Sequence, residues 1–230
     1  MGKLDEAERC LEELIKKFPQ SARVRRLVGI ILECEGKFDE ANSMYEILLK
    51  ENPANLLVLK RKVCIMKAQR DVKGQIEALN KVVKSFPLEV PSWVELGEIY
   101  LSLCDYKPAA HCFEECILLE PSNASFHTRL AETYYTIDGL EYTTNARRHF
   151  MLSLEIQSAA INKRALYGMV MACKKIDELS GSLSTMDAKV NREFIDWCAQ
   201  ALHSVAAGSC GSRSQSDVDI LGIVATSIMR

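Results

Sequence analysis

The sequence predicts an all-α protein built from stacked helical hairpins, and three observations support this prediction. Four of the six prolines stand 34 residues apart, namely Pro19, Pro53, Pro87 and Pro121. Between them, apolar residues recur at the i, i+3, i+4, i+7 spacing of an amphipathic helix. The 230 residues include only 11 Gly and 6 Pro, which disfavours a turn-rich all-β fold. A fixed repeat period of this size indicates a solenoid of helical hairpins.

The composition is that of a folded chain, with 48% hydrophobic and 26% charged residues. Lys and Arg number 29 against 31 Asp and Glu, a net charge of −2, which disfavours a dedicated nucleic-acid binder. Nine cysteines without a C-x-x-C pair indicate reduced thiols in the cytosol. The chain begins without a signal-peptide pattern, and its most apolar segment, 220–229, is too short to span a membrane.

The unit 90–123 shows the repeat most clearly. Its predicted first helix carries a stripe formed by Trp93, Leu96, Gly97 and Tyr100. Its predicted second helix carries a stripe formed by Ala109, Phe113 and Cys116, and Pro121 follows that helix. The pattern W-x2-L-G-x2-Y, A-x3-F and P resembles the tetratricopeptide repeat (TPR). This resemblance implies a right-handed superhelical solenoid of TPR helical hairpins, completed by C-terminal capping helices.

The period divides the chain into elements in order. Residues 1–176 form the predicted TPR solenoid, which consists of a half repeat at 2–20, repeats at 22–55, 56–89, 90–123 and 124–160, and the first helix of a fifth at 161–176. We expect a linker at 177–186 and C-terminal helices at 187–230 with a flexible Gly/Ser stretch at 207–216.

The N-terminal half repeat lacks the first helix of its hairpin. Leu4, Ala7 and Leu11 are therefore expected to expose an apolar face. We expect the chain to be an N-terminally shortened form of a longer protein, or one in which a partner covers that end.

The sequence contains little catalytic chemistry, so an enzyme is not expected. It has no glycine-rich phosphate loop, no G-x-S-x-G elbow and no H-E-x-x-H pair. One cluster, Cys104, His111, Cys112 and Cys116, makes a metal site conceivable. Because Cys116 occupies a repeat column of small buried residues, we favour core packing there and expect neither a metal nor a cofactor.

The concave groove of such a solenoid is lined by the first helix of each hairpin. The predicted groove residues are Arg23, Arg26, Lys60, Lys67, Val94, Glu98, Leu101, Tyr135 and Met169. The four basic residues predict binding of a partner segment that carries acidic residues or a carboxylate. The alternative that stays open is ordinary solvated charge paired with local Glu. The apolar far end of the groove (Ala165, Met169, Ala172) suggests a second, hydrophobic contact.

Several stretches resemble one family in particular. They are 18–21 with 23–27, 61–63 with 67–69, 135–136 with 139–141, 146–150 and 162–168. Together they are similar to the second subunit of the ER membrane protein complex, a TPR protein, over about residues 7–175.

The resemblance implies a non-catalytic scaffold, peripheral on the cytosolic face of the ER. Its partners would be the cytosolic tails of the membrane subunits and a second soluble subunit. It would have no nucleic-acid partner, and it would associate with the membrane only through partners. The complex would support insertion of tail-anchored and multi-pass proteins into the ER membrane.

Two alternatives remain. A chaperone cofactor would clamp an acidic peptide, yet Ile30 and Cys64 stand where that activity needs Asn. A helical-repeat auxiliary subunit of a transferase would instead accompany a soluble catalytic chain.

Overall fold

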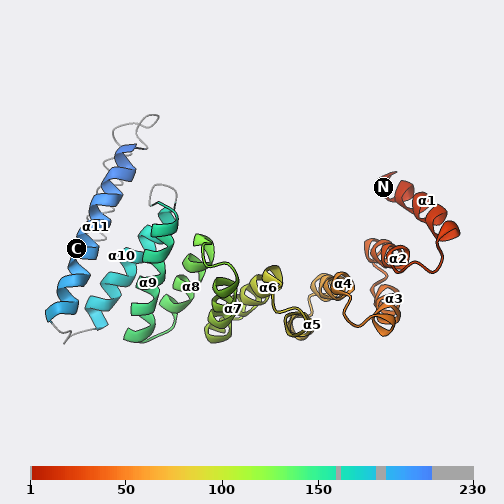
Figure 1. Cartoon of the computed structure of the whole chain (residues 1–230), viewed down its shortest axis with the longest axis horizontal. Coiled ribbons are helices and arrows are strands. Elements are labelled where there is room, and N and C mark those ends of the chain that lie inside the picture. Colours follow the sequence, from red (N-terminus) through yellow and green to blue (C-terminus); the bar gives the residue numbers. More distant parts are fainter. Residues whose placement is uncertain (1, 159–161, 180–184, 209–230) are drawn as a thin grey trace. The chain divides into compact units, whose positions relative to one another are not determined.

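The computed structural model describes residues 2–158, 162–179 and 185–208, and every regular element in these ranges is an α-helix (Figure 1). For residues 2–4, 185–188 and 203–208 only the backbone is described. The helices are α1 (Gly2–Lys17), α2 (Ala22–Cys34), α3 (Phe38–Glu51), α4 (Leu56–Ala68), α5 (Val72–Ser85), α6 (Val90–Ser102), α7 (Tyr106–Leu119), α8 (Ala124–Thr136), α9 (Leu140–Ile156), α10 (Lys163–Leu179) and α11 (Thr185–Gly208). The predicted all-α, helical-repeat fold is confirmed.

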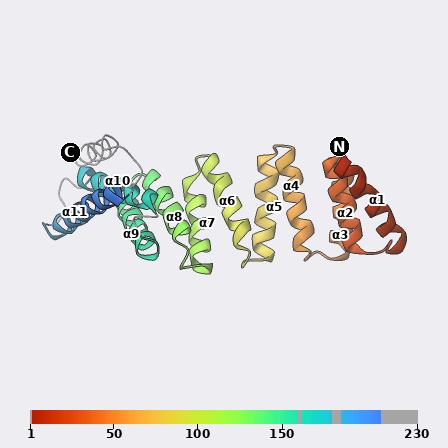
Figure 2. The same cartoon turned by 90° about the horizontal axis from the view of Figure 1, so that it is seen from above.

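The chain divides between Ile99 and Tyr100, within α6, into two compact units. In the first unit, α2 packs on α1, α3 and α4, and α4 packs on α5. In the second unit, α8 lies between α7 and α9 (Figure 2), and α10 lies between α9 and α11 (Figure 1). These helices therefore contact mainly their neighbours in the chain, as expected where no hairpin can bury its apolar face alone.

The periodic prolines stand two residues after the second helices of the hairpins. Helices α3, α5 and α7 end at Glu51, Ser85 and Leu119, and residues Asn52, Phe86 and Glu120 follow with φ of −141°, −134° and −132°. The ring of a following proline disfavours the helical conformation in the residue before it, so these three residues leave the helix. The proline period thus marks where each second helix ends.

The turn inside each of the first three hairpins places one residue in the left-handed region. These residues are Gly36 (φ 80°), Arg70 (φ 58°) and Cys104 (φ 58°), again 34 apart. In each turn the next residue donates a backbone hydrogen bond five residues back, for example Lys37 N to Leu32 O at 2.9 Å. This is the Schellman helix end, which favours glycine at the left-handed position.

Close helix contacts require small residues opposite aromatic rings. A Cβ atom added to Gly29 would lie 2.4 Å from Cε1 of Tyr45, and one added to Gly168 would lie 2.3 Å from Cζ of Phe150. Tyr45 and Phe150 are both fully buried. Glycine at these two positions therefore allows the rings to fill the space between helices.

Three expectations about the ends of the chain need correction. Leu11 is buried, because α2 packs against α1, whereas Ala7 is exposed; the Leu4 side chain lies outside the described residues. Residues 177–179 of the predicted linker belong to α10, and residues 180–184 lie outside the description. Helix α11 begins at Thr185 and continues to Gly208, past the start of the predicted flexible stretch at 207–216. The rest of that stretch and of the predicted C-terminal helices, residues 209–230, lies outside the described residues.

The left-handed turn position gives a reciprocal test. Substituting Arg70→Gly should raise the free energy of unfolding by about 1 kcal/mol, because an L side chain with positive φ is strained. Substituting Gly36→Ala should lower it by about 1–2 kcal/mol, since nothing lies within 4 Å of the added Cβ and only the backbone is affected. Urea denaturation followed by circular dichroism measures both changes, and equal signs for the two variants would contradict the assignment.

Candidate partner-binding surface

The predicted groove residues lie on the first helices of the hairpins. In the first unit, α2 carries Arg23 and Arg26, α4 carries Lys60 and Lys67, and α6 carries Val94 and Glu98. In the second unit the remaining three are Leu101, Tyr135 and Met169, on α6, α8 and α10.

Ion pairs in the first unit engage both predicted lysines. Lys60 pairs with Glu89, and Lys67 Nζ lies 3.0 Å from Oε1 of Glu95 on α6. A third pair, between Arg61 of α4 and Glu33 of α2, also joins first helices of neighbouring hairpins. The positive charges of Lys60, Arg61 and Lys67 are therefore balanced by carboxylates of the same chain. This agrees with the alternative that the basic residues pair with local Glu.

Glu33 is the centre of this network, a role that the repeat pattern did not single out. Its side chain is only 9% exposed. It accepts hydrogen bonds from the Tyr45 hydroxyl at 2.6 Å and from Arg61 Nε at 3.0 Å. Burial, and then the hydrogen bond to Glu33, raise the pKa of Tyr45 above its usual range. Glu33 thus links α2, α3 and α4 through one part-buried carboxylate.

Arg23 and Arg26 are different, because neither has an ion-pair partner among the described residues. Their neighbour Arg25 forms a bidentate ion pair with Glu51 of α3, with Nη1–Oε1 and Nη2–Oε2 distances of 2.7 and 2.6 Å. Arg23 is exposed and Arg26 is half-buried. Three residues apart on one helix, the two guanidinium groups lie on adjoining turns of the same face. They form a small basic surface, which we call the α2 arginine pair.

Val94, Glu98 and Leu101 are all half-buried on α6. Leu101 packs against the cluster of Ala109 and Phe113 in the second unit. On α8, Tyr135 contacts α10, where Lys175 Nζ lies 4.8 Å from its ring centroid and donates to its carbonyl oxygen at 2.9 Å.

The prediction that Met169 lines an open groove is wrong. Met169, Ala165 and Ala172 are fully buried. They belong to a core cluster that also contains Cys198 and Leu202 of α11. Helix α11 has no counterpart in the repeat pattern, and its packing on α10 places these side chains in the interior.

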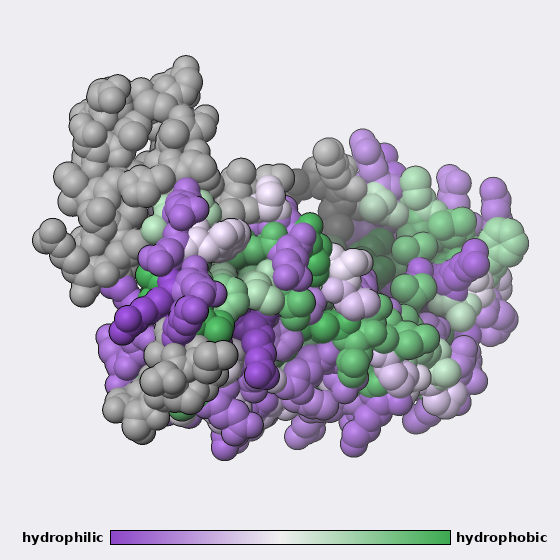
Figure 3. All heavy atoms as spheres, turned by 60° about the vertical axis from the view of Figure 1, so that its left-hand side comes forward, coloured by the Kyte–Doolittle hydropathy of each residue, from purple (hydrophilic) through white to green (hydrophobic). Residues whose placement is uncertain are grey.

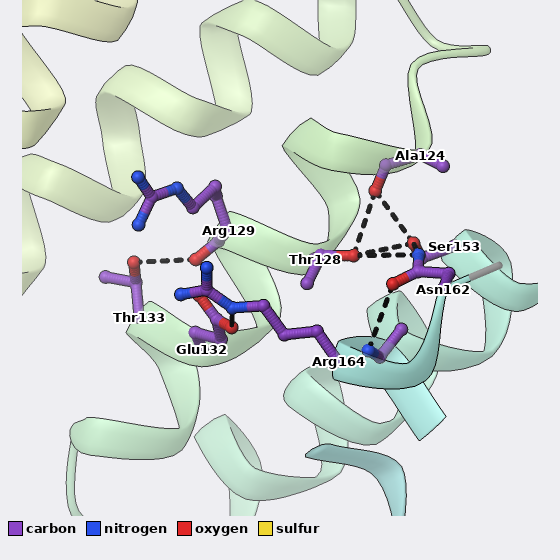
Figure 4. Close-up of polar contacts among 9 residues, drawn as sticks. Ala124, Thr128, Arg129, Glu132, Thr133, Ser153, Asn162 and Arg164 are labelled. Carbon is purple, nitrogen blue, oxygen red and sulfur yellow. Dashed lines mark hydrogen bonds and ion pairs between the residues drawn. The ribbon is translucent and has the colours of Figure 1, made fainter. Parts of the chain in front are cut away.

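A buried polar cluster joins α8, α9 and the start of α10 (Figure 4). Thr128 Oγ1 and Ser153 Oγ lie 2.7 Å apart, and Asn162 Nδ2 donates to Ser153 Oγ at 2.8 Å. Beside it, Arg164 pairs with Glu132, with Nη2 2.8 Å from Oε2. Each buried group has a partner, so the cluster stabilises the helix packing instead of offering a reactive group.

The cysteine cluster is spread over different environments. Cys104 lies exposed in a turn, whereas Cys112 and Cys116 are buried on α7. Burial raises the pKa of both buried thiols to about 12, which disfavours the thiolate that a metal requires. In the part of the chain that the structure describes, no group of three or more His, Cys, Asp or Glu could hold a metal ion.

Two histidines form a further contact between α8 and α9. His127 Nε2 lies 3.0 Å from the Pro121 carbonyl oxygen and must therefore donate to it. The Nδ1 atoms of His127 and His149 lie 3.2 Å apart, and with both rings neutral His149 is the donor in this contact. Burial, and then the neighbouring His127, lower the pKa of His149.

On the face seen in the space-filling view, hydrophilic side chains cover much of the surface and hydrophobic ones gather between them (Figure 3). None of the described helices combines the length and the hydrophobicity needed to cross a membrane.

The hairpins, the glycine–aromatic contacts and the paired first helices define a helical-repeat protein of the tetratricopeptide type. A family model described as the EMC2 TPR-like repeat domain matches residues 7–148, and the chain belongs to this family. It is 35% identical over 201 residues to ER membrane protein complex subunit 2-A of Xenopus laevis, covering 87% of this chain and 67% of that protein.

Two further similarities are more distant. TPR repeat protein oca3 of Schizosaccharomyces pombe is 28% identical over 193 residues, covering 83% of this chain and 68% of that protein. A crystal structure of MamA protein aligns with a TM-score of 0.59 at 17% identity, covering 84% of this chain and 96% of MamA, and shows the fold alone.

The part-buried Glu33 carboxylate and the exposed Lys67–Glu95 ion pair should differ in their contribution to stability. Glu33→Gln should lower the free energy of unfolding by about 1–3 kcal/mol, because Arg61 loses its charged partner in a partly buried site. Lys67→Met should change it by less than about 1 kcal/mol, as for exposed pairs in general, because the lysine side chain is 66% exposed. Urea denaturation measures the free energy of unfolding of both variants. A similar decrease for the two would show that Glu33 is not central to the ion-pair network.

The histidine contact predicts a pH dependence. Because the pKa of His149 is lowered in the folded state, the unfolded chain binds the extra proton more readily. Stability should therefore fall as the pH drops from about 7.5 through the ordinary histidine pKa of about 6.5. Thermal melting of His149→Gln should show a smaller fall over this range, and an unchanged slope would assign the dependence to other groups.

Proposed function

We propose that this chain is a non-catalytic scaffold subunit of the ER membrane protein complex. The observation that carries this proposal is family membership, since the family model matches residues 7–148 and the amphibian relative bears the name of that subunit. As a scaffold, the chain binds the cytosolic tails of membrane subunits and a second soluble subunit. It lies on the cytosolic face of the ER and supports insertion of tail-anchored and multi-pass proteins by partner subunits.

The arrangement of charges supports a binding role. Most first-helix charges in the first unit are paired within the chain, as Lys60, Arg61 and Lys67 show. The α2 arginine pair has no ion-pair partner among the described residues and can bind an anionic group of another molecule. A guanidinium group binds a carboxylate with two hydrogen bonds, so an acidic segment of a partner fits this site. We assign one partner contact to Arg23 and Arg26 on this basis.

Affinity purification of the tagged chain from cells in mild detergent, followed by mass spectrometry, tests the function. We expect several ER membrane proteins to be recovered together with a second soluble subunit. Recovery of chaperones alone, or of a soluble transferase alone, would overturn the proposal in favour of an adaptor or an auxiliary subunit.

The same purification tests the α2 arginine pair. Arg23→Glu with Arg26→Glu should reduce partner recovery about tenfold, because two charge-assisted contacts are replaced by repulsion. Lys16→Glu with Lys17→Glu is the matched control, since it makes the same change of charge on two exposed residues of α1. Circular dichroism melting checks that both variants fold, and equal recovery from both would show that Arg23 and Arg26 do not bind a partner.

A further inference from the structure

Helices α9, α10 and α11 enclose an apolar cavity in the second unit. Its volume is about 490 Å³, and it is lined by Met151, Leu154, Glu155, Met169, Val190, Glu193, Phe194 and Trp197. All eight residues lie beyond position 148, where the match to the family model ends. The cavity therefore lies outside the part of the chain that the family model matches.

One wall of the cavity is a regular helical stripe. Val190, Glu193, Phe194 and Trp197 follow each other at i, i+3, i+4 and i+7 on α11. With a rise of 1.5 Å per residue, this stripe runs about 10 Å along the helix, or two turns. On the opposite wall, Met151, Leu154 and Glu155 occupy about one turn of α9, and buried Met169 forms part of the floor. Apolar walls on two helices, one of them about two turns long, suit the apolar face of another helix.

Two large apolar side chains of the stripe remain exposed. Val190 is 41% exposed and Trp197 is 46% exposed. Tryptophan has a large apolar area, and it is among the residues most enriched at interface positions that dominate binding energy. An exposed tryptophan beside an apolar cavity indicates a binding surface more strongly than a single exposed aliphatic residue does.

The wall is held in place by buried hydrogen bonds. Asn191 is fully buried and accepts a hydrogen bond from Arg147 Nη1 at 2.6 Å. Its Nδ2 donates to the Cys173 carbonyl oxygen at 2.9 Å and to Asp177 Oδ1 at 2.6 Å. Arg147 also lies 5.2 Å from the ring centroid of Phe194. A fixed wall lowers the ordering cost of binding.

The charge at the rim determines the kind of occupant. The two charged residues of the lining are Glu155 on α9 and Glu193 on α11, and both are exposed. Neither has a hydrogen-bond or ion-pair partner among the described residues. Two unpaired carboxylates on opposite walls attract cationic side chains and repel acidic segments and anionic lipid headgroups.

We propose that this cavity is a docking site for an amphipathic helix of a partner protein, with its apolar face inserted beside Trp197 and lysine or arginine residues next to Glu155 and Glu193. This docking site would add a second partner contact to the proposed scaffold function. It rests on that function only for the assumption that the occupant is a protein segment. It adds a second contact whose charge preference is opposite to that of the α2 arginine pair.

The test uses the full chain and three labelled peptides of about 18 residues, long enough to form a helix. The first carries leucines on one helical face and lysines on the other, the second has glutamates in place of the lysines, and the third has the composition of the first with the leucine positions scrambled. Fluorescence anisotropy measures binding. We expect the first peptide to bind at least about tenfold more tightly than the other two.

Substitutions then locate the site. Trp197→Ala should weaken binding of the lysine peptide about tenfold. Glu155→Lys with Glu193→Lys should reverse the preference in favour of the glutamate peptide. Leu118→Ala is the control, because Leu118 is 74% exposed on α7 in the same unit but does not line the cavity. Circular dichroism melting checks that each variant folds.

Three outcomes would overturn the proposal. The first is equal binding of the lysine peptide to the Trp197→Ala variant. The second is binding to phosphatidylserine-containing vesicles in preference to the peptide. The third concerns a variant that combines Leu221→Asp, Val224→Asp and Ile228→Asp. If this variant binds the lysine peptide at least about tenfold more tightly than the unchanged chain, the chain's own C-terminal segment is the occupant. Since the titration uses purified protein, its failure is distinct from a failure to recover ER membrane proteins.

Discussion

The fold depends on the close approach of helices whose apolar stripes cannot be covered within one hairpin. The contacts of Tyr45 with Gly29 and of Phe150 with Gly168 show how this is achieved, with an aromatic ring filling the space that a missing Cβ leaves. The first of these contacts joins the two helices of one hairpin, and the second joins neighbouring hairpins. The sequence period follows from this constraint, because each added hairpin must present the same small and aromatic positions at the same offsets.

The same approach brings the first helices of neighbouring hairpins within reach of one another. In the first unit this produces the Glu33–Arg61 and Lys67–Glu95 pairs, and in the second unit the Glu132–Arg164 pair. A charge on a first helix is therefore commonly used to join hairpins. The charges that stay unpaired at the two proposed sites are informative for that reason. They are cationic on α2 and anionic around the α9–α11 cavity, so the two sites select different partner segments.

The sequence predicts well those features that each repeat determines locally. The ends of the second helices follow from the prolines, and buried Tyr45 and Phe150 occupy the columns where the pattern expects rings. The pattern also identifies α2 and α4 as the helices that carry the cations. It does not show which cations are free, because Lys60 and Lys67 meet carboxylates 29 and 28 positions further along the chain. Such pairs depend on the rotation of one hairpin relative to the next, which a repeat pattern leaves undetermined.

Met169 and Leu11 show the other limit of sequence reasoning. A repeat pattern assigns each position to a face of its own helix, whereas burial depends on which neighbour covers that face. Helix α2 covers Leu11, and the cluster around Met169 includes Cys198 and Leu202 of α11. Neither neighbour can be deduced from the motif in the covered helix.

Helix α11 therefore has two faces with different roles. A helix that only closes the end of a helical stack needs one apolar face against its neighbour and a polar outer face. Helix α11 has the first of these in Cys198 and Leu202, which are packed with the α10 core. Its other side departs from the requirement, because Val190 and Trp197 remain more than 40% exposed beside the cavity. Exposed apolar area of this kind costs solubility and contributes nothing to packing within the chain. The exposed apolar surface of Val190 and Trp197 lies on a helix that the hydrogen bonds of Asn191 hold in place. This arrangement is explained if α11 both covers α10 and contacts a partner.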